Sequence, residues 1–173
     1  MGNKACTIAV QTDASSYAAG SEVTGKVYVS ITDPNGVPVR SLNICFCGEE
    51  KVVIHYTDHR HGGNQQQQHH QNDHYERKIS PIFNLDAPIH TTVNGRIPVG
   101  QYEFPFQVVV PHFSPSSMRF KDGKSNCQIR YYMQAYLNSG GNRNLNNIFS
   151  NPFKPNTFAS SKTYLEITGT QQL

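Results

Sequence analysis

The stretch Glu22–Ile31 reads EVTGKVYVSI, and its apolar residues fall at every second position. This alternation is typical of a β-strand that buries one face and exposes the other. The face expected to be buried carries Val23, Gly25, Val27, Val29 and Ile31. Pairing such strands buries one face of each, which is how the core of a β-sandwich is made. The stretch therefore predicts a sandwich.

Other segments repeat this pattern on both sides of the first. Leu42, Ile44 and Phe46 alternate with polar or small residues, and residues 127–137 hold the longest alternation in the chain. Residues 33–36 read DPNG, a strong turn signal between strands. We expect a first strand near residues 6–11 and a last one over residues 162–168.

The composition agrees with an all-β protein. The chain has 13 valines and 11 isoleucines against six leucines, with 10 prolines and 13 glycines. β-branched residues favour strands, and frequent Pro and Gly favour turns. At 173 residues the chain is expected to form a single domain, residues 1–173.

Charge and cysteine usage limit the function classes. The formal net charge is only +3 and the basic residues are dispersed, which argues against nucleic acid as a partner. No apolar run approaches the roughly 20 residues of a membrane-spanning helix, and the N-terminus does not resemble a signal peptide. Four scattered cysteines do not form a disulfide pattern, so we expect a cytoplasmic location.

Motifs for catalysis are missing from the sequence. It contains no Gly-x-Ser-x-Gly elbow and no phosphate-binding glycine loop. Glu49 and Glu50 are adjacent carboxylates that should face apart on a strand, and Cys45 and Cys47 alternate with apolar residues as packing groups. We therefore expect no enzymatic activity and no cofactor.

Residues 57–74 form a low-complexity segment rich in His and Gln, which we interpret as a polar loop. His55, His59 and His61 are weak candidates for a zinc or copper site. A metal- or ligand-binding β-sandwich that uses this loop is thus an alternative function, although solvated polar residues explain the same composition.

The N-terminus partly matches a lipidation signal. Gly2 stands where a myristoyl chain would be attached, but the sixth residue is Cys6 rather than Ser or Thr. Cys6 is a candidate for a second, reversible acyl group. Such acylation would place part of the protein at the plasma or endosomal membrane, as a peripheral membrane protein.

Several segments, in order, resemble the N-terminal domain of arrestins. Residues 17–29 look like its second-strand signature, and residues 41–50 resemble the next strand, which ends in Gly and an acidic residue. Residues 100–106, GQYEFPF, and residues 108–117 are similar to the family's aromatic, Phe-Pro-Phe and Pro-Ser stretch. The strand around residues 129–135 fits as well.

This resemblance implies an immunoglobulin-like β-sandwich of the arrestin N-terminal type. It further implies a non-enzymatic adaptor or scaffold in endocytosis, protein sorting or signalling, whose partners are cytoplasmic tails of membrane proteins, ubiquitin ligases or trafficking coats. A retromer-type subunit of the Vps26 family is a related alternative. The first strand lacks the lysine pair of phosphate-sensing arrestins, and Thr24 replaces an acidic residue. The chain therefore looks more like the alpha-arrestins and Vps26-related proteins.

Two places are candidates for partner binding. Residues 49–56, which include Glu49 and Glu50, are expected to form an exposed strand edge that could accept a partner strand. Arg77 and Lys78 form the only adjacent basic pair and are candidates for contact with a phosphate or an acidic tail.

Overall fold

The computed structural model describes residues 5–58, 72–139 and 157–169, and these contain eleven β-strands and no helix. The bounds are β1 (Cys6–Thr12), β2 (Ser16–Ala18), β3 (Glu22–Ile31), β4 (Val37–Pro38), β5 (Ser41–Asp58), β6 (Asn72–Thr91), β7 (Arg96–Ile97), β8 (Gly100–Val109), β9 (Met118–Asp122), β10 (Ser125–Asn138) and β11 (Thr157–Thr168). The all-β prediction is confirmed.

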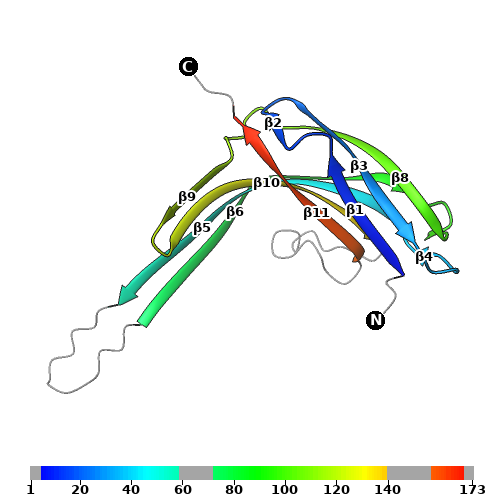
Figure 1. Ribbon diagram of the computed structural model, residues 1–173, viewed down its shortest axis with the longest axis horizontal. Coiled ribbons are helices and arrows are strands. Elements are labelled where there is room, and N and C mark those ends of the chain that lie inside the picture. Colours follow the sequence, from blue (N-terminus) through cyan, green and yellow to red (C-terminus); the bar gives the residue numbers. More distant parts are fainter. Residues whose placement is uncertain (1–4, 59–71, 140–156, 170–173) are drawn as a thin grey trace.

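The strands form two main sheets and a small ribbon. One sheet has three antiparallel strands in the order β1-β3-β8, and the other runs β2-β11-β10-β5-β6, with β9 paired to β10. Strands β4 and β7 form the ribbon. The two larger sheets face each other and make a sandwich, which lies to the right in Figure 1. The expected immunoglobulin-like sandwich architecture is therefore present.

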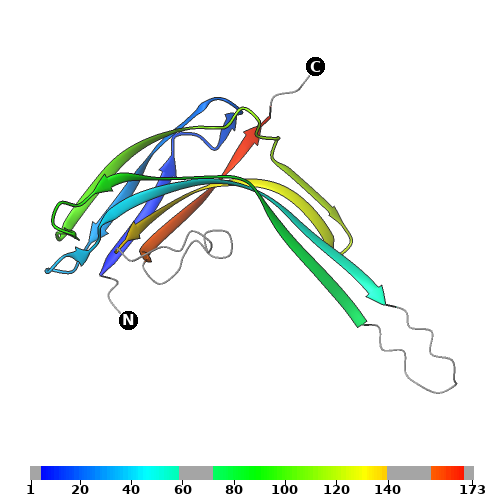
Figure 2. The same cartoon turned by 180° about the vertical axis from the view of Figure 1, so that it is seen from behind.

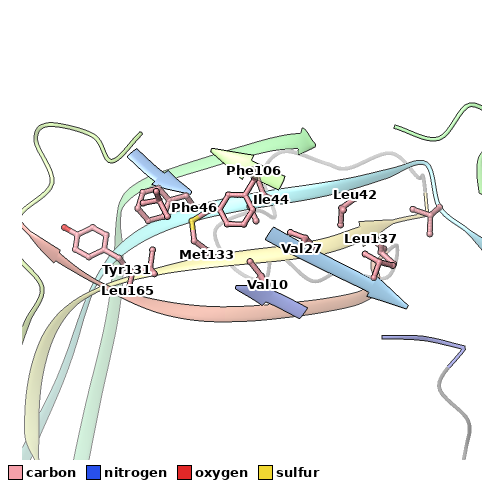
Figure 3. Close-up of a cluster of buried hydrophobic side chains, with 14 of the residues drawn as sticks. Val10, Val27, Leu42, Ile44, Phe46, Phe106, Tyr131, Met133, Leu137 and Leu165 are labelled. Atoms are coloured by element: carbon pink, nitrogen blue, oxygen red, sulfur yellow. The ribbon is translucent and has the colours of Figure 1, made fainter. Parts of the chain in front are cut away.

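The core lies between the two sheets (Figure 3). Val27 on β3 and Phe46 on β5 are fully buried, as are Met133 and Leu137 on β10. The alternation of Glu22–Ile31 appears in the structure as expected, with each residue of its apolar face buried and Gly25 closely packed against Phe106.

The strands of the two sheets differ greatly in length. β5 has 18 residues and β6 has 20, whereas β3 and β8 have 10 each. At about 3.3 Å per residue, β5 and β6 outrun the opposite sheet by roughly 25–30 Å. The excess projects away from the sandwich as a long extension, seen from both sides in Figures 1 and 2.

We call this extension the arm. It consists of residues 49–58 of β5, 72–81 of β6, 118–122 of β9 and 125–130 of β10, in the spatial order β6-β5-β10-β9. The rest of the sandwich is called the body.

Two expected boundaries need correction. Thr57, Asp58 and Asn72–His74 were expected in the polar loop but belong to strands, because the β5–β6 pairing continues as far as Asp58 and Asn72. Residues 59–71 of that loop lie outside the described residues. The last strand begins at Thr157, earlier than expected, since its pairing with β10 reaches Asn138.

Candidate protein-binding surface

Gly48 marks the junction between the body and the arm. It lies between Phe83 on β6 and Tyr131 on β10, and the two rings stack across it with centroids 5.7 Å apart. A Cβ atom at Gly48 would come within 2.6 Å of the Tyr131 ring and 2.9 Å of the Phe83 ring. Only glycine lets the two rings close over this strand.

Beyond this junction the core-facing side of the large sheet continues without a covering layer from the described residues. Successive residues of a strand point to opposite faces, and paired residues share a face. The side that carries Phe46 in the body therefore carries Val52, Ile54 and Tyr56 in the arm. We call this side of the arm the inner face and the opposite side the outer face.

The inner face is apolar along its middle. Ile129 packs against the edge of the core, and Cys127 and Val52 are half-buried beside it. Four large apolar side chains on this face are exposed to 46–62%: Ile54, Tyr56, Met118 and Phe120. Large exposed apolar side chains gathered on one face of a sheet indicate an interaction surface.

Carboxylates border this apolar patch. Glu50, Glu76 and Asp122 lie on the inner face and are exposed. Lys78 and His74 also lie there, and the His74 ring stacks on Tyr56 at 5.3 Å. The inner face thus offers apolar contact area with a mainly acidic border.

The outer face has the opposite charge. Four cations project from it, which we call the outer-face cations: Lys51, Arg77, Arg119 and Lys121. Its two carboxylates are already engaged. Glu49 pairs with Arg130, and Asp73 pairs with Lys124 at 2.5 Å and with His55 at 3.1 Å. The Lys124 ammonium, followed by His55, holds the pKa of Asp73 below its usual value.

A small polar cluster lies on the same side of the sheet in the body. The Sγ atoms of Cys45 and Cys47 are 2.9 Å apart, and Cys45 donates to Asn84 Oδ1 at 2.9 Å. The Cys45 contact lowers the pKa of Cys47, and burial raises the pKa of neighbouring Tyr132. Lys162 Nζ lies 3.4 Å from the centroid of the Tyr132 ring. Neither cysteine forms a disulfide, and both side chains pack on the face away from the main core.

Partner binding by Arg77, Lys78, Glu49 and Glu50 stays a prediction, but the strand pairing shows which face of the sheet each side chain takes. Arg77 lies on the outer face and Lys78 on the inner face, so the two cannot contact one ligand group together. Glu49 and Glu50 face apart as expected, and Glu49 is held by Arg130.

The expected free edge at residues 49–56 is wrong for residues 49–53. Residues 49–53 are paired with β6 on one side and β10 on the other. Beyond them, the backbone N–H of His55 donates to Ser125 Oγ at 2.9 Å. The edge strands of the arm are β6 and β9 as far as Val53, and beyond it the strand pairing of β5 is with β6 alone.

The histidine candidates for a metal are not brought together in the described part of the chain. His55 contacts Asp73 and packs against the Tyr75 ring at 4.9 Å. His59 and His61 lie outside the described residues. Within residues 5–58, 72–139 and 157–169, no group of three or more His, Cys, Asp or Glu side chains could hold a metal ion.

Of the two candidates for lipidation, the structure describes only Cys6. Gly2 lies outside the described residues. Cys6 begins β1 and is only 7% exposed in the core, where burial raises the pKa of its thiol. Acylation of Cys6 would require β1 to detach from the body.

The comparison with known protein families decides the identity. Residues 6–153 match the family described as "Arrestin (or S-antigen), N-terminal domain". The chain belongs to this family. Domains of this arrestin type are in general non-enzymatic and bind proteins.

A search of solved structures finds the sporulation control protein Spo0M from Bacillus subtilis. It is 15% identical, with a TM-score of 0.45, and the match covers 96% of this arrestin-family chain and 50% of Spo0M. The chain thus spans about half the length of that protein. No curated protein matches the sequence. In the described residues, no helix is long and apolar enough to cross a membrane.

Sequence reasoning missed the two faces of the arm. Part of the signal was present: in MRFKD at Met118–Asp122 the first four residues alternate apolar and polar side chains. It was missed because alternation identifies a two-faced strand but does not show which strands outrun the opposite sheet.

Proposed function

We propose that this arrestin-family chain is a non-enzymatic adaptor that binds cytoplasmic regions of membrane proteins, or the ubiquitin ligases and coats that sort them. It would act in the cytoplasm and at the plasma or endosomal membrane, in endocytosis, sorting or signalling. The observation that carries the proposal is the uncovered apolar inner face of the arm.

The charges of this face support a partner from the cytoplasmic side of a membrane. Glu50, Glu76 and Asp122 border the apolar patch. Cytoplasmic loops of membrane proteins carry an excess of Lys and Arg near their membrane-spanning segments. A segment that combines apolar side chains with such cations complements both parts of the inner face.

Site-specific photo-crosslinking in cells tests this proposal. A photoreactive residue would replace Phe120 on the inner face or, as a matched control, the exposed Tyr28 on β3 in the body. We expect the Phe120 position to cross-link to cytoplasmic segments of integral membrane proteins or to sorting factors, with the linked peptides identified by mass spectrometry. Cross-links to neither class would contradict the adaptor function.

A binding measurement on a captured segment then tests the surface itself. Phe120→Ala should weaken binding about tenfold or more, since truncating a central aromatic residue of an interface commonly costs that much. Tyr75→Ala on the opposite face should leave the affinity within about twofold. Equal losses in the two variants would assign binding to another surface.

A further inference from the structure

The outer face of the arm gathers cations from three of its four strands. The pairing register places Lys51 and Arg119 in one cross-strand row on either side of Gln128. In the next row, Arg77 and Lys121 flank Val53 and Asn126. The outer-face cations therefore form two adjacent rows on one side of the sheet.

The described part of the chain does not neutralise these cations. Among residues 5–58, 72–139 and 157–169, the outer-face cations take part in no ion pair. The carboxylates that share their face, Glu49 and Asp73, are held by Arg130, Lys124 and His55 instead. Among the described residues the face thus carries a net positive charge, which an anionic partner can compensate.

The distance between the cations indicates what kind of anionic partner they can bind. Arg77 and Lys121 are three strands apart, about 14 Å at a strand spacing of about 4.8 Å. One phosphate or carboxylate cannot contact cations so far apart, but an array of anionic groups in a plane can. Peptides that add to a sheet use a free edge, whereas these side chains stand on the face.

Apolar side chains lie among the cations. Tyr75 and Ile79 on β6 are on the outer face and are 58% and 44% exposed. Aromatic and aliphatic side chains between basic residues are typical of surfaces that rest in the headgroup region of a bilayer. The inner face could not serve this purpose on an anionic surface, because Glu50, Glu76 and Asp122 would be repelled.

We propose that the outer face of the arm binds the surface of an anionic phospholipid membrane. The outer-face cations contact the headgroups, and Tyr75 and Ile79 enter the interfacial region. This inference does not rest on the proposed adaptor function. It is compatible with it, because a membrane on the outer face leaves the inner face open to a protein partner.

Vesicle flotation with the full chain tests the proposal. The protein would be produced in bacteria, so that no acyl chain on Gly2 contributes. We expect binding to vesicles of phosphatidylcholine and phosphatidylserine, weak binding to pure phosphatidylcholine, and release when salt rises from about 0.1 M to about 0.5 M.

The adjacent residues Arg77 and Lys78 provide a matched pair of variants. They remove the same charge from neighbouring positions on opposite faces. Arg77→Gln should weaken vesicle binding about fivefold, the contribution expected of one cation near an anionic surface. Lys78→Gln should change it by less than about twofold. Replacing all four outer-face cations by Gln should abolish binding while the circular dichroism spectrum stays that of a β-protein.

The same experiment has outcomes that overturn the proposal. These are equal binding to neutral vesicles, equal losses for Arg77→Gln and Lys78→Gln, and no vesicle binding at all. Fluorescence anisotropy with a labelled oligoglutamate peptide tests whether the anionic partner is an acidic protein segment instead of a membrane. Peptide binding that depends on Arg77, without vesicle binding, would assign the face to an acidic protein segment. If the inner face gave no cross-links in cells, the adaptor proposal would fail, but the vesicle-binding result would still stand.

Discussion

The body and the arm share strands β5, β6 and β10, yet the same alternation of side chains has different results in the two. In the body, the β1-β3-β8 sheet covers the apolar side, and Phe46 and Met133 are 0% exposed. In the arm, the apolar side continues as Ile54 and Phe120, which are 48% and 62% exposed. The body uses its apolar side for stability, and the arm keeps it available for contact with other molecules.

The largest expected difference between the two regions concerns apolar truncation. Phe46→Ala should lower the free energy of unfolding by about 3–5 kcal/mol, because it leaves a cavity in the core. Phe120→Ala should change it by no more than about 0.5 kcal/mol, since its ring is mostly in water. Urea unfolding of the two variants measures both values. A similar loss for Phe120→Ala would mean that another part of the chain covers the inner face.

The junction gives the next largest effect. Gly48→Ala should destabilise the protein by about 1–3 kcal/mol, because the added methyl group overlaps the rings of Phe83 and Tyr131. The same substitution in a Phe83→Ala background should cost clearly less, since the removed ring leaves room. A double-mutant cycle of unfolding free energies measures this coupling. Additive effects would show that the ring contact does not explain the glycine.

These two regions also mark how far sequence reasoning reaches. The strand Glu22–Ile31 was predicted with its bounds and its buried face, because period-two alternation and a strong turn at residues 33–36 define it locally. The resemblance in residues 100–117 added the arrestin-type architecture. Neither source could give the arm, whose exposure depends on the difference in length between β5 and β3, two strands of different sheets.

The candidate site was harder to predict than the fold. Arg77 and Lys78 are adjacent in sequence and were grouped for that reason, although a strand sends adjacent side chains to opposite faces. The residues that accompany Arg77 are Lys51, Arg119 and Lys121, from strands that only the pairing register brings together. The register of distant strands is set by the whole sheet, so local patterns do not reveal it.

Alkaline pH should affect the body more than the arm. Burial raises the pKa of Tyr131 to about 12, and its hydroxyl donates to the carbonyl of Pro115 at 2.6 Å. The unfolded chain loses this proton near pH 10, while the folded chain retains it. Stability should therefore fall as the pH rises from about 10 towards about 12.

Tyrosine variants check this alkaline effect. Thermal unfolding of Tyr131→Phe between about pH 8 and about pH 12, two units on either side of the ordinary tyrosine pKa, should show a shallower decline than the parent chain. Tyr132, whose pKa burial also raises, accounts for part of the remaining slope. An unchanged slope in Tyr131→Phe would exclude its phenol as the cause.

Acidic pH should have the smallest effect, and it should be confined to the arm. The carboxylate of Asp73 on β6 joins Lys124 in the β9–β10 turn to His55 on β5, and these contacts lower its pKa. A lowered folded-state pKa contributes stability that is present above the ordinary aspartate range and is lost as the pH falls through the folded value.

Hydrogen exchange should therefore quicken at the end of the arm below about pH 4, after correction for the intrinsic exchange rate, while amides of the body keep their protection. Asp73→Asn should show the faster exchange already at neutral pH, because it removes the charge that holds the three strands together. Equal loss of protection in β3 and β8 would mean that the arm unfolds only together with the body, and the distinction between the two regions would not extend to their stability.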